Sequence, residues 1–199
     1  MNTPQPAIGQ IFKALAFAAE KHRNQRREDS GKTPYINHPI ALANVLVNEG
    51  GVTDTETLCA ALLHDTLEDT ETTEEELRRH FGAAIAHLVR EVSDDKGLHW
   101  RERKRLQVER APHISKPAQH IKLADKICNL RDLVASPPSA WPPERRREYC
   151  EWANAVVNAI RTANPALAEQ FDHIYAQRLR PDLGYSRRQR NPLPICTIL

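Results

Sequence analysis

The sequence predicts an all-α domain, and three features of its 199 residues support that prediction. Proline is absent between Pro39 and Pro112, and glycine is scarce, with 7 in the whole chain. Apolar residues recur at helical spacing in that interval, whereas the strict alternation of a half-buried strand is absent. Because proline and glycine interrupt helices, their positions mark the expected helix ends. The length favours one domain with a core of its own.

The first two helices are expected between residues 7 and 50. The first lies in Ala7–Arg27, where a polar run follows an apolar stripe made of Ile8, Ile11, Phe12, Leu15, Ala18 and Ala19. Asparagine is a residue type that caps helix N-termini, and proline fits the first turn. Asn37 is therefore expected to cap a second helix, with Pro39 in its first turn and Gly50-Gly51 at its end.

Two capping residues predict the next pair of helices. Asp54 is expected to cap a third helix that runs through Leu67. Thr73 and Glu76, three positions apart, match the pattern of a capping box. This box predicts a short fourth helix that ends near Gly82.

The second half of the chain predicts five more helices and a tail. The fifth helix is marked by apolar residues at helical spacing, namely Ile85, Leu88, Val89 and Val92. The others are predicted over Trp100–Arg110, Lys116–Ala135, Pro143–Ala163 and from Asn164-Pro165 to about Leu179. Residues 180–199 lack an apolar stripe. We therefore expect a domain over 1–179 and a flexible basic tail over 180–199.

Composition and charge exclude several classes of protein. The formal net charge is +2, of which residues 178–199 contribute +4, so the rest of the chain carries −2. A dedicated nucleic-acid-binding domain is usually strongly basic, so that class is not favoured. No stretch is apolar enough for a membrane span, and the N-terminus lacks the pattern of a secretory leader. Four cysteines without a CxxC pair add to the expectation of a cytoplasmic protein.

The segment AALLHDTLEDT places ionisable side chains on one side of a predicted helix. His64 and Glu68 are four positions apart, and Asp65 and Asp69 form the neighbouring stripe. The opposite side of the helix is apolar. An ordinary solvated helix end is the alternative interpretation, but such faces rarely carry a His-Asp pair inside an apolar run.

The segment HIKLADKICNLRDL contains a second candidate group. Asp125 and Asn129 are four positions apart, on a different face from the expected buried stripe of Leu123, Ile127, Leu130 and Val134. An aspartate beside an apolar stripe needs a partner, because an unpaired buried carboxylate is costly. Lys126 or Arg131 would supply that partner in a plain salt bridge, and a metal ion would supply it otherwise.

His38, in the segment YINHP, completes a set of two histidines and two aspartates. Such nitrogen and oxygen ligands suit Mn²⁺, Fe²⁺ or another ion that accepts octahedral coordination, rather than the thiolate sites of structural zinc. Four protein ligands leave room for water, and a divalent ion lowers the pKa of that water and polarises a phosphoryl oxygen. Glu68 and Asp69, just beyond the ligands, would then be placed for proton transfer.

Basic residues recur near these segments. They stand at Arg23, Arg26, Arg27, Lys96, 101–105 and 145–147. Runs of charge are usually solvated helix faces. A site that cleaves phosphate esters also needs cations for its anionic substrate, and arginine can stack on a purine through its flat guanidinium.

The order His38, His64-Asp65, Asp125 is that of the ligands in HD-domain phosphohydrolases. The surrounding segments point to a smaller group of proteins within this class. AAEKHRNQRREDSGKTPYINHPIALANVL, AALLHDTLEDT, EVSDDKGL, ERKRLQVERAPH and KLADKICNLRDL resemble the RelA/SpoT hydrolase domain. The resemblance is closest to its stand-alone form, the metazoan SpoT homologue and small alarmone hydrolase family, and covers about Ile8–Leu179.

This resemblance implies an all-helical HD-domain bundle with a catalytic metal site between helices. It implies a metal-dependent 3′-pyrophosphohydrolase that converts (p)ppGpp to GDP or GTP and pyrophosphate, with one Mn²⁺ per chain. By motif, the metal ligands would be His38, His64, Asp65 and Asp125, and the catalytic pair Glu68 and Asp69. The substrate-binding residues would be Arg27, Asn129, Arg145 and Tyr149.

One position departs from the family pattern. The family commonly has Arg-Lys where this chain has Arg27-Glu28. A carboxylate that faced the pocket would repel an anionic substrate. Glu28 is therefore expected to turn outward and pair with Arg23 or Lys32.

Two other functions remain open at this point. The metazoan form is also similar to enzymes that remove the 2′-phosphate from NADPH, so an HD-domain phosphatase acting on NADPH or another nucleotide is the first alternative. A metal-retaining nucleotide-binding module without catalysis is the second, although the intact Glu68-Asp69 pair argues against it. All three functions take a small nucleotide as partner, not a nucleic acid or a membrane, and leave the oligomeric state open.

Overall fold

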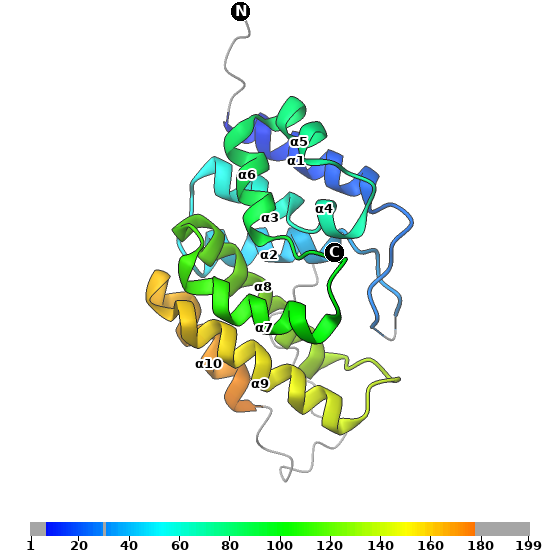
Figure 1. The fold of residues 1–199 in the computed structure, drawn as a ribbon, viewed down its shortest axis with the longest axis vertical. Helices are drawn as coiled ribbons and strands as arrows, with labels where there is room; N and C mark the ends of the chain where they lie inside the picture. Colours follow the sequence, from blue (N-terminus) through cyan, green and yellow to red (C-terminus); the bar gives the residue numbers. More distant parts are fainter. Residues whose placement is uncertain (1–6, 30, 178–199) are drawn as a thin grey trace, which may run out of the picture.

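The computed structural model describes residues 7–29 and 31–177, and within these ranges the chain forms packed helices and no strand (Figure 1). Arg26 and Pro34 form an isolated antiparallel bridge. The helices are α1 Ala7–Lys21, α2 Asn37–Asn48, α3 Thr55–Leu63, α4 Thr66–Asp69, α5 Glu74–Phe81, α6 Ala83–Val92, α7 Trp100–Arg110, α8 Lys116–Ala135, α9 Pro143–Ile160 and α10 Pro165–Gln177, with short 3₁₀ helices at Ala111–His113 and Arg161–Ala163. The all-α prediction is confirmed. The predicted tail at 180–199, with the boundary at residue 179, lies outside the described residues.

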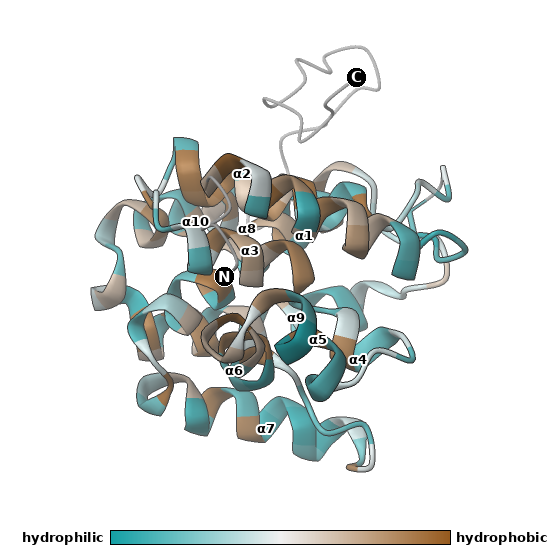
Figure 2. Ribbon diagram, turned by 90° about the horizontal axis from the view of Figure 1, so that it is seen from above, coloured by the Kyte–Doolittle hydropathy of each residue, from teal (hydrophilic) through white to brown (hydrophobic). Residues whose placement is uncertain are grey.

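Helix α8 is the centre of the packing. It contacts α2, α3, α6, α9 and α10, and its Leu123, Ile127 and Leu130 are fully buried, as the predicted stripe requires. Val134, the last member of that stripe, is only half-buried. Helix α7 differs, because none of its residues is buried, and Figure 2 shows it as a mainly hydrophilic helix at the edge of the molecule. No helix among the described residues is long and apolar enough to cross a membrane.

Three predicted helix starts carry the expected side-chain caps. Asp54 Oδ2 accepts a hydrogen bond from the Thr57 N–H at 2.8 Å, and Thr73 Oγ1 accepts one from the N–H three residues later at 3.1 Å. Asn164 Oδ1 accepts one from Leu167 N–H at 3.1 Å. These bonds satisfy N–H groups that have no partner inside the helix, which explains why the starts were predictable.

Two helix boundaries differ from the prediction. Asn37 is the first residue of α2, and Ile36 occupies the cap position without a side-chain hydrogen bond, so the predicted Asn37 cap is wrong. The third helix does not run through Leu67, because it ends at Leu63 and a separate short helix, α4, starts at Thr66. The Thr66 hydroxyl donates to the Leu63 carbonyl at 2.7 Å, a local bond that competes with helix continuation. His64 and Asp65 therefore lie in a turn between two helices.

The predicted apolar stripe of α1 is only partly correct. Ile8 and Phe12 are 66% and 63% exposed, whereas Ala14 and Ala18 are completely buried. Helix α1 packs chiefly against α3. Small side chains allow a close approach of two helices, so the alanine face of α1 turns to the core, and Ile11, Leu15 and Phe17 pack at its border.

Candidate functional site

The turn between α3 and α4 brings the sequential pair His64-Asp65 into a fixed geometry. His64 Nδ1 lies 2.8 Å from the carbonyl oxygen of Ala61 one turn earlier, so the N–H is assigned to Nδ1 and the lone pair to Nε2. That Nε2 lies 2.8 Å from Asp65 Oδ2. His38, near the start of α2, places its Nε2 3.9 Å from the same carboxylate oxygen. Ligand-type atoms of these three residues all lie within 4.8 Å of one another.

Asp125 on α8 joins this group through His38. Its Oδ1 lies 3.3 Å from His38 Nε2 and accepts from Asn129 Nδ2 at 2.6 Å, while its Oδ2 accepts from Lys126 Nζ at 2.8 Å. The salt bridge with Lys126, one of the alternatives that the sequence left open, therefore exists together with the approach to His38. Three of the four predicted ligands form the compact group, and Asp125 borders it.

The donor set fits a divalent cation. His38 and His64 are 4% and 6% exposed, and His38 Nδ1 and His64 Nε2 have no hydrogen-bond partner among the residues that the structure describes. His64 Nε2 and Asp65 Oδ2 are close without the geometry of a hydrogen bond. Two atoms that coordinate the same cation can lie 2.8 Å apart, as these two do, with no proton between them. Imidazole nitrogens and carboxylate oxygens are also the ligand types that such ions take.

Electrostatics support the same conclusion. Burial acts to raise the pKa of Asp65, but the charge of His64 holds that pKa well below its usual range. Burial likewise acts to raise the pKa of Asp125, which Lys126 and His38 hold well below the usual range. Burial lowers the pKa of His38, so its ring is neutral. Burial also acts to lower the pKa of His64, and the charge of Asp65 raises it above the ordinary value. A proton on His64 or a cation beside it can therefore offset the Asp65 charge.

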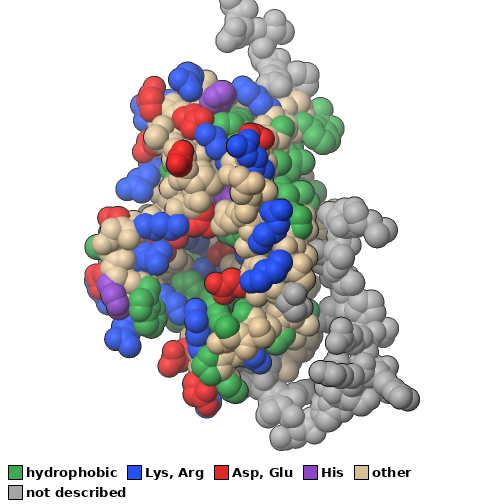
Figure 3. All heavy atoms as spheres, turned by 90° about the vertical axis from the view of Figure 1, so that its right-hand side faces the viewer, with side chains coloured by type: hydrophobic (Ala, Val, Ile, Leu, Met, Phe, Trp, Pro, Cys, Tyr) green, Lys and Arg blue, Asp and Glu red, His purple; other side chains and the backbone are tan. Residues whose placement is uncertain are grey.

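These residues face a cavity with an empty volume of about 630 Å³, open mouth included. It is lined by all four predicted ligands, by Glu68 and Asp69, and by Arg27, Asn129 and Tyr149 among the predicted substrate contacts. Its walls come from α2, α4, α6, α7, α8, α9, the turn between α3 and α4, and the segment before α2. Figure 3 shows a face of the molecule on which basic and acidic side chains gather around a hollow.

Glu68 and Asp69 on α4 are held by the segment that links α6 to α7, by α7 and by the segment that follows α1. Glu68 Oε2 accepts from the Asp94 backbone N–H at 3.2 Å, and its Oε1 lies 3.3 Å from Arg103 Nη1. Asp69 accepts from Lys96 Nζ at 2.5 Å and from Gln25 Nε2 at 3.2 Å. Burial, with the nearby charge of Asp94, raises the pKa of Glu68.

The predicted substrate contacts divide into two groups. Arg27 Nη2 donates to Asn129 Oδ1 at 2.9 Å and to Asp132 Oδ2 at 2.7 Å, so this guanidinium is already oriented at the cavity wall. Tyr149 lines the cavity from α9, and burial raises its pKa. Arg145 is not among the lining residues. It is exposed and stacks over Trp141, with its guanidinium carbon 4.1 Å from the ring centroid.

Glu28 does not pair with Arg23, which bonds to Glu20 instead. Glu28 is exposed, as expected, but its Oε2 accepts from Trp141 Nε1 at 3.2 Å. The contact joins the segment before α2 to the segment before α9, which are 113 residues apart in sequence. The prediction considered only basic residues near Glu28 in sequence, because local spacing reveals no distant partner. In the structure, a contact between distant segments takes the place of the expected ion pair.

Comparison with known proteins decides the family. Residues 14–151 match the family model described as HD domain. The chain belongs to the HD-domain family. The His64-Asp65 pair, at the turn described above, lies within the matched residues.

Several proteins similar to this HD domain come from animals. It is 54% identical over 165 residues to guanosine-3′,5′-bis(diphosphate) 3′-pyrophosphohydrolase MESH1 of Xenopus tropicalis, covering 83% of this chain and 92% of that protein. It is 54% identical over 169 residues to MESH1 of Homo sapiens, covering 85% and 94%. A solved structure of a metazoan ortholog of SpoT that hydrolyzes ppGpp matches with a TM-score of 0.84 at 46% identity, over 89% of this chain and 98% of that one.

The HD-domain cavity contains residues that sequence reasoning missed. The Tyr35 hydroxyl donates to Asp65 Oδ2 at 2.5 Å, and no local pattern joins two residues 30 positions apart. Lys122 and Lys126 also line the cavity. A signal for them was present, because positions 122, 125, 126 and 129 recur at i, i+3, i+4 and i+7 and so share one face of α8.

Proposed function

We propose that this HD-domain protein is a metal-dependent 3′-pyrophosphohydrolase of guanosine-3′,5′-bis(diphosphate) and its triphosphate analogue. The observation that carries the proposal is the buried His38, His64, Asp65 group beside Glu68 and Asp69 in a single cavity. A mixed nitrogen and oxygen donor set next to two further carboxylates suits hydrolysis of a phosphate ester. The names and the high identity of the animal relatives support guanosine bis(diphosphate) as the substrate.

His38, His64, Asp65 and Asp125 would hold one Mn²⁺ ion. The low pKa values of both aspartates and the unpartnered Nε2 of His64 support this ligand set. The absence of thiolate ligands among these four favours Mn²⁺ over structural zinc. When bound, such an ion lowers the pKa of water and polarises a phosphoryl oxygen.

Glu68 would accept the proton of the attacking water. Its two oxygens are fixed from separate directions by Asp94 N–H and Arg103, and its raised pKa makes it a stronger base near neutral pH. Asp69, held by Lys96 and Gln25, would orient the same water. These partners keep both carboxylates in place without a contribution from substrate.

The reaction exchanges one bond for another at the phosphorus next to O3′. A water oxygen bonds to that phosphorus and the bond from phosphorus to O3′ breaks. O3′ takes one proton, and the second proton of water passes through Glu68 to pyrophosphate or solvent. Arg27 lies against Asn129 at the cavity wall, where its oriented guanidinium would stack on the guanine and the Asn129 amide would contact the ribose.

A product assay on the purified, Mn²⁺-loaded protein tests this function. Guanosine bis(diphosphate) and NADPH are offered side by side, and pyrophosphate, orthophosphate and the nucleotide products are separated and measured. We expect pyrophosphate and GDP from the first substrate. Orthophosphate from NADPH with no product from the first substrate would overturn the proposal and favour the NADPH phosphatase. Binding of nucleotide without any product would favour a non-catalytic module.

Replacing Tyr35 by phenylalanine should weaken Mn²⁺ binding about 10- to 100-fold, the usual cost of losing a hydrogen bond to a metal ligand. The change removes only the hydroxyl that donates to Asp65 Oδ2 and keeps the ring that stacks on His22, with centroids 4.9 Å apart. Mn²⁺ affinity measured by calorimetry checks the prediction, with thermal unfolding as a control for the fold. An unchanged affinity would show that Tyr35 does not orient Asp65 for metal binding.

Replacing Glu28 by lysine should lower KM for guanosine bis(diphosphate) by about two- to fivefold and leave kcat close to unchanged. Glu28 is exposed, so a charge change there acts through solvent and has a small effect. A change in KM with an unchanged kcat indicates that the bound substrate and the transition state are stabilised by the same amount. Glu28→Gln, which retains an acceptor for Trp141 Nε1, separates charge from the Trp141 contact. A tenfold fall in kcat in the lysine variant would give Glu28 a role in turnover and contradict this prediction.

A further inference from the structure

The cations around the catalytic cavity are not equivalent. Arg27 is paired with Asp132 at 2.7 Å, and Lys126 with Asp125 at 2.8 Å. Lys122 also lines the cavity, but it has no ion pair with a carboxylate anywhere in the described parts of the chain. Its hydrogen bond runs from Nζ to the Val92 carbonyl oxygen at 2.5 Å. Lys122 is thus the lining cation whose charge no carboxylate neutralises directly.

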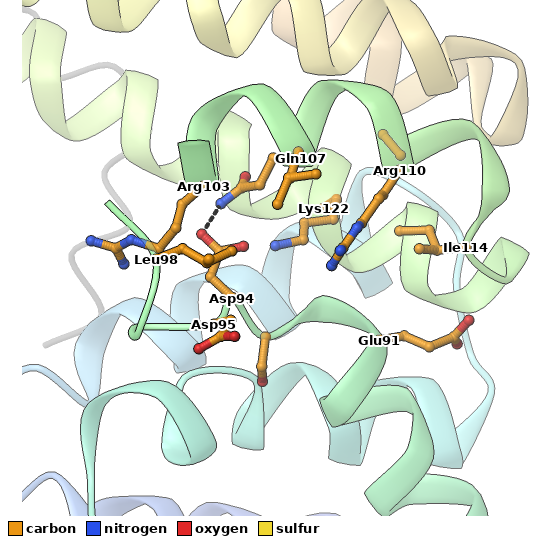
Figure 4. A pocket seen from close by; sticks show the side chains of 12 residues that line it. Glu91, Asp94, Asp95, Leu98, Arg103, Gln107, Arg110, Ile114 and Lys122 are labelled. Atoms are coloured by element: carbon orange, nitrogen blue, oxygen red, sulfur yellow. Dashed lines mark hydrogen bonds between the residues drawn. The ribbon is translucent and has the colours of Figure 1, made fainter. Parts of the chain in front are cut away.

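Lys122 stands at the junction of two cavities. A second cavity, with an empty volume of about 470 Å³, lies between the segment that follows α6, helix α7 and helix α8 (Figure 4). Gln107 and Lys122 line both cavities. Figure 4 shows the Lys122 side chain extending toward Asp94, with Arg110 from the end of α7 entering from the other side. Two basic side chains, Lys122 and Arg110, therefore line the second cavity, and Lys122 also lines the cavity that contains the catalytic carboxylates.

The acidic residues of the second cavity are already engaged. Asp94 Oδ2 accepts from Gln107 Nε2 at 2.6 Å, and both oxygens of Glu91 accept from Ser115, at 3.0 and 2.6 Å. Burial lowers the pKa of Lys122, with the charge of Lys126 adding to that effect and the charges of Asp94, Asp125 and Glu68 opposing it. An ammonium has three donors, of which Val92 takes one. A partly buried ammonium with donors left over and no carboxylate within ion-pair distance can take an anion as a further partner.

The position of Lys122 on α8 indicates which anion this is. Lys122 precedes Asp125 by one helical turn on the same face, so it lies beyond the proposed metal ligand toward the second cavity. We propose that Lys122 holds the outer phosphate of the 3′-diphosphate, and then the pyrophosphate product, at the junction of the two cavities. The proposal rests on the proposed function for the identity of the substrate. The ligand class, an inorganic or esterified diphosphate, follows from an ammonium without a carboxylate ion pair and from Arg110, a second cation that lines the adjoining cavity.

Lys122→Met tests the proposal because methionine keeps an unbranched side chain of similar length and removes the charge. Inhibition of hydrolysis by inorganic pyrophosphate and by GDP is measured at fixed free Mn²⁺, and pyrophosphate binding is measured directly by calorimetry. We expect pyrophosphate to bind about 10- to 100-fold more weakly, the usual scale for losing a hydrogen bond to a charged group. GDP inhibition should stay unchanged, because Arg27 and Asn129, rather than Lys122, are its proposed contacts.

Two further variants keep the result interpretable. Lys122→Arg preserves the charge and should retain most of the pyrophosphate affinity, and Lys116→Met removes an exposed lysine from the same helix and should change nothing. Equal pyrophosphate affinity in wild type and Lys122→Met would overturn the proposal, as would parallel losses of pyrophosphate and GDP binding, which indicate a structural role. If the wild-type protein failed to hydrolyse guanosine bis(diphosphate), the proposed function would fail, yet the calorimetric comparison would still decide the role of Lys122.

Discussion

Replacing Glu68 by alanine should lower kcat by about 10²- to 10⁴-fold and leave both the fold and the bound metal in place. Proton transfer by a positioned side chain typically contributes that range. Glu68 borders the cavity but is absent from the compact group of ligand-type atoms formed by His38, His64 and Asp65. Its removal relieves the cost of a partly buried carboxylate beside Asp94 but also takes an acceptor from Asp94 N–H and Arg103, so we expect a small net change in stability.

The measurement combines kinetics with metal analysis. Turnover is compared at saturating substrate, and metal content is determined on the same preparations by elemental analysis. Glu68→Gln removes the base but keeps the acceptor for Asp94 N–H, so it should be nearly as inactive as the alanine variant. Glu71→Ala, at an exposed position two residues after the catalytic pair, should be close to wild type. Near-normal turnover in a metal-replete Glu68→Ala protein would remove Glu68 from the mechanism.

Helix starts could be predicted because capping is local. Asp54, Thr73 and Asn164 each bond to an N–H three residues later, and that geometry depends on a few neighbouring residues alone. The face of α1 that packs on α3 could not be predicted in the same way. Ile8 and Phe12 have the right spacing for a core stripe, but the close approach of two helices favours Ala14 and Ala18, and that approach is a property of the tertiary packing.

The candidate site likewise contains contacts that local spacing could predict and contacts that depend on tertiary packing. Spacing on a helix placed Asp125 and Asn129 on one face, and they are joined by a 2.6 Å hydrogen bond. Spacing could not reveal that α3 ends before His64, which changes how the HD pair is presented to the cavity. It also could not pair Arg27 with Asp132, 105 residues away, because such contacts depend on how helices come together. The resemblance to a family identified which polar residues form the site. It did not give the distances between them.

Replacing Asp65 by alanine should abolish Mn²⁺ binding together with hydrolysis, unlike the change at Glu68. Asp65 Oδ2 is the atom nearest to the others of the group, 2.8 Å from His64 Nε2 and 3.9 Å from His38 Nε2. Its removal takes away the negative charge that both histidines share. The loss should exceed the 10- to 100-fold expected from an outer hydrogen bond such as that of Tyr35, because a ligand itself is removed.

Thermal unfolding with and without Mn²⁺ gives a readout that does not depend on turnover. A ligand at 100 times its Kd stabilises the native state by about 2.7 kcal/mol, which corresponds to roughly 5–10 °C in Tm for a domain of this size. Wild type and Glu68→Ala should both show that shift, and Asp65→Ala should show none. A full shift in Asp65→Ala would mean that the ion binds elsewhere. No shift in Glu68→Ala would make Glu68 part of the metal site, and the division between ligands and catalytic carboxylates would then have to be redrawn around the turn that follows α3.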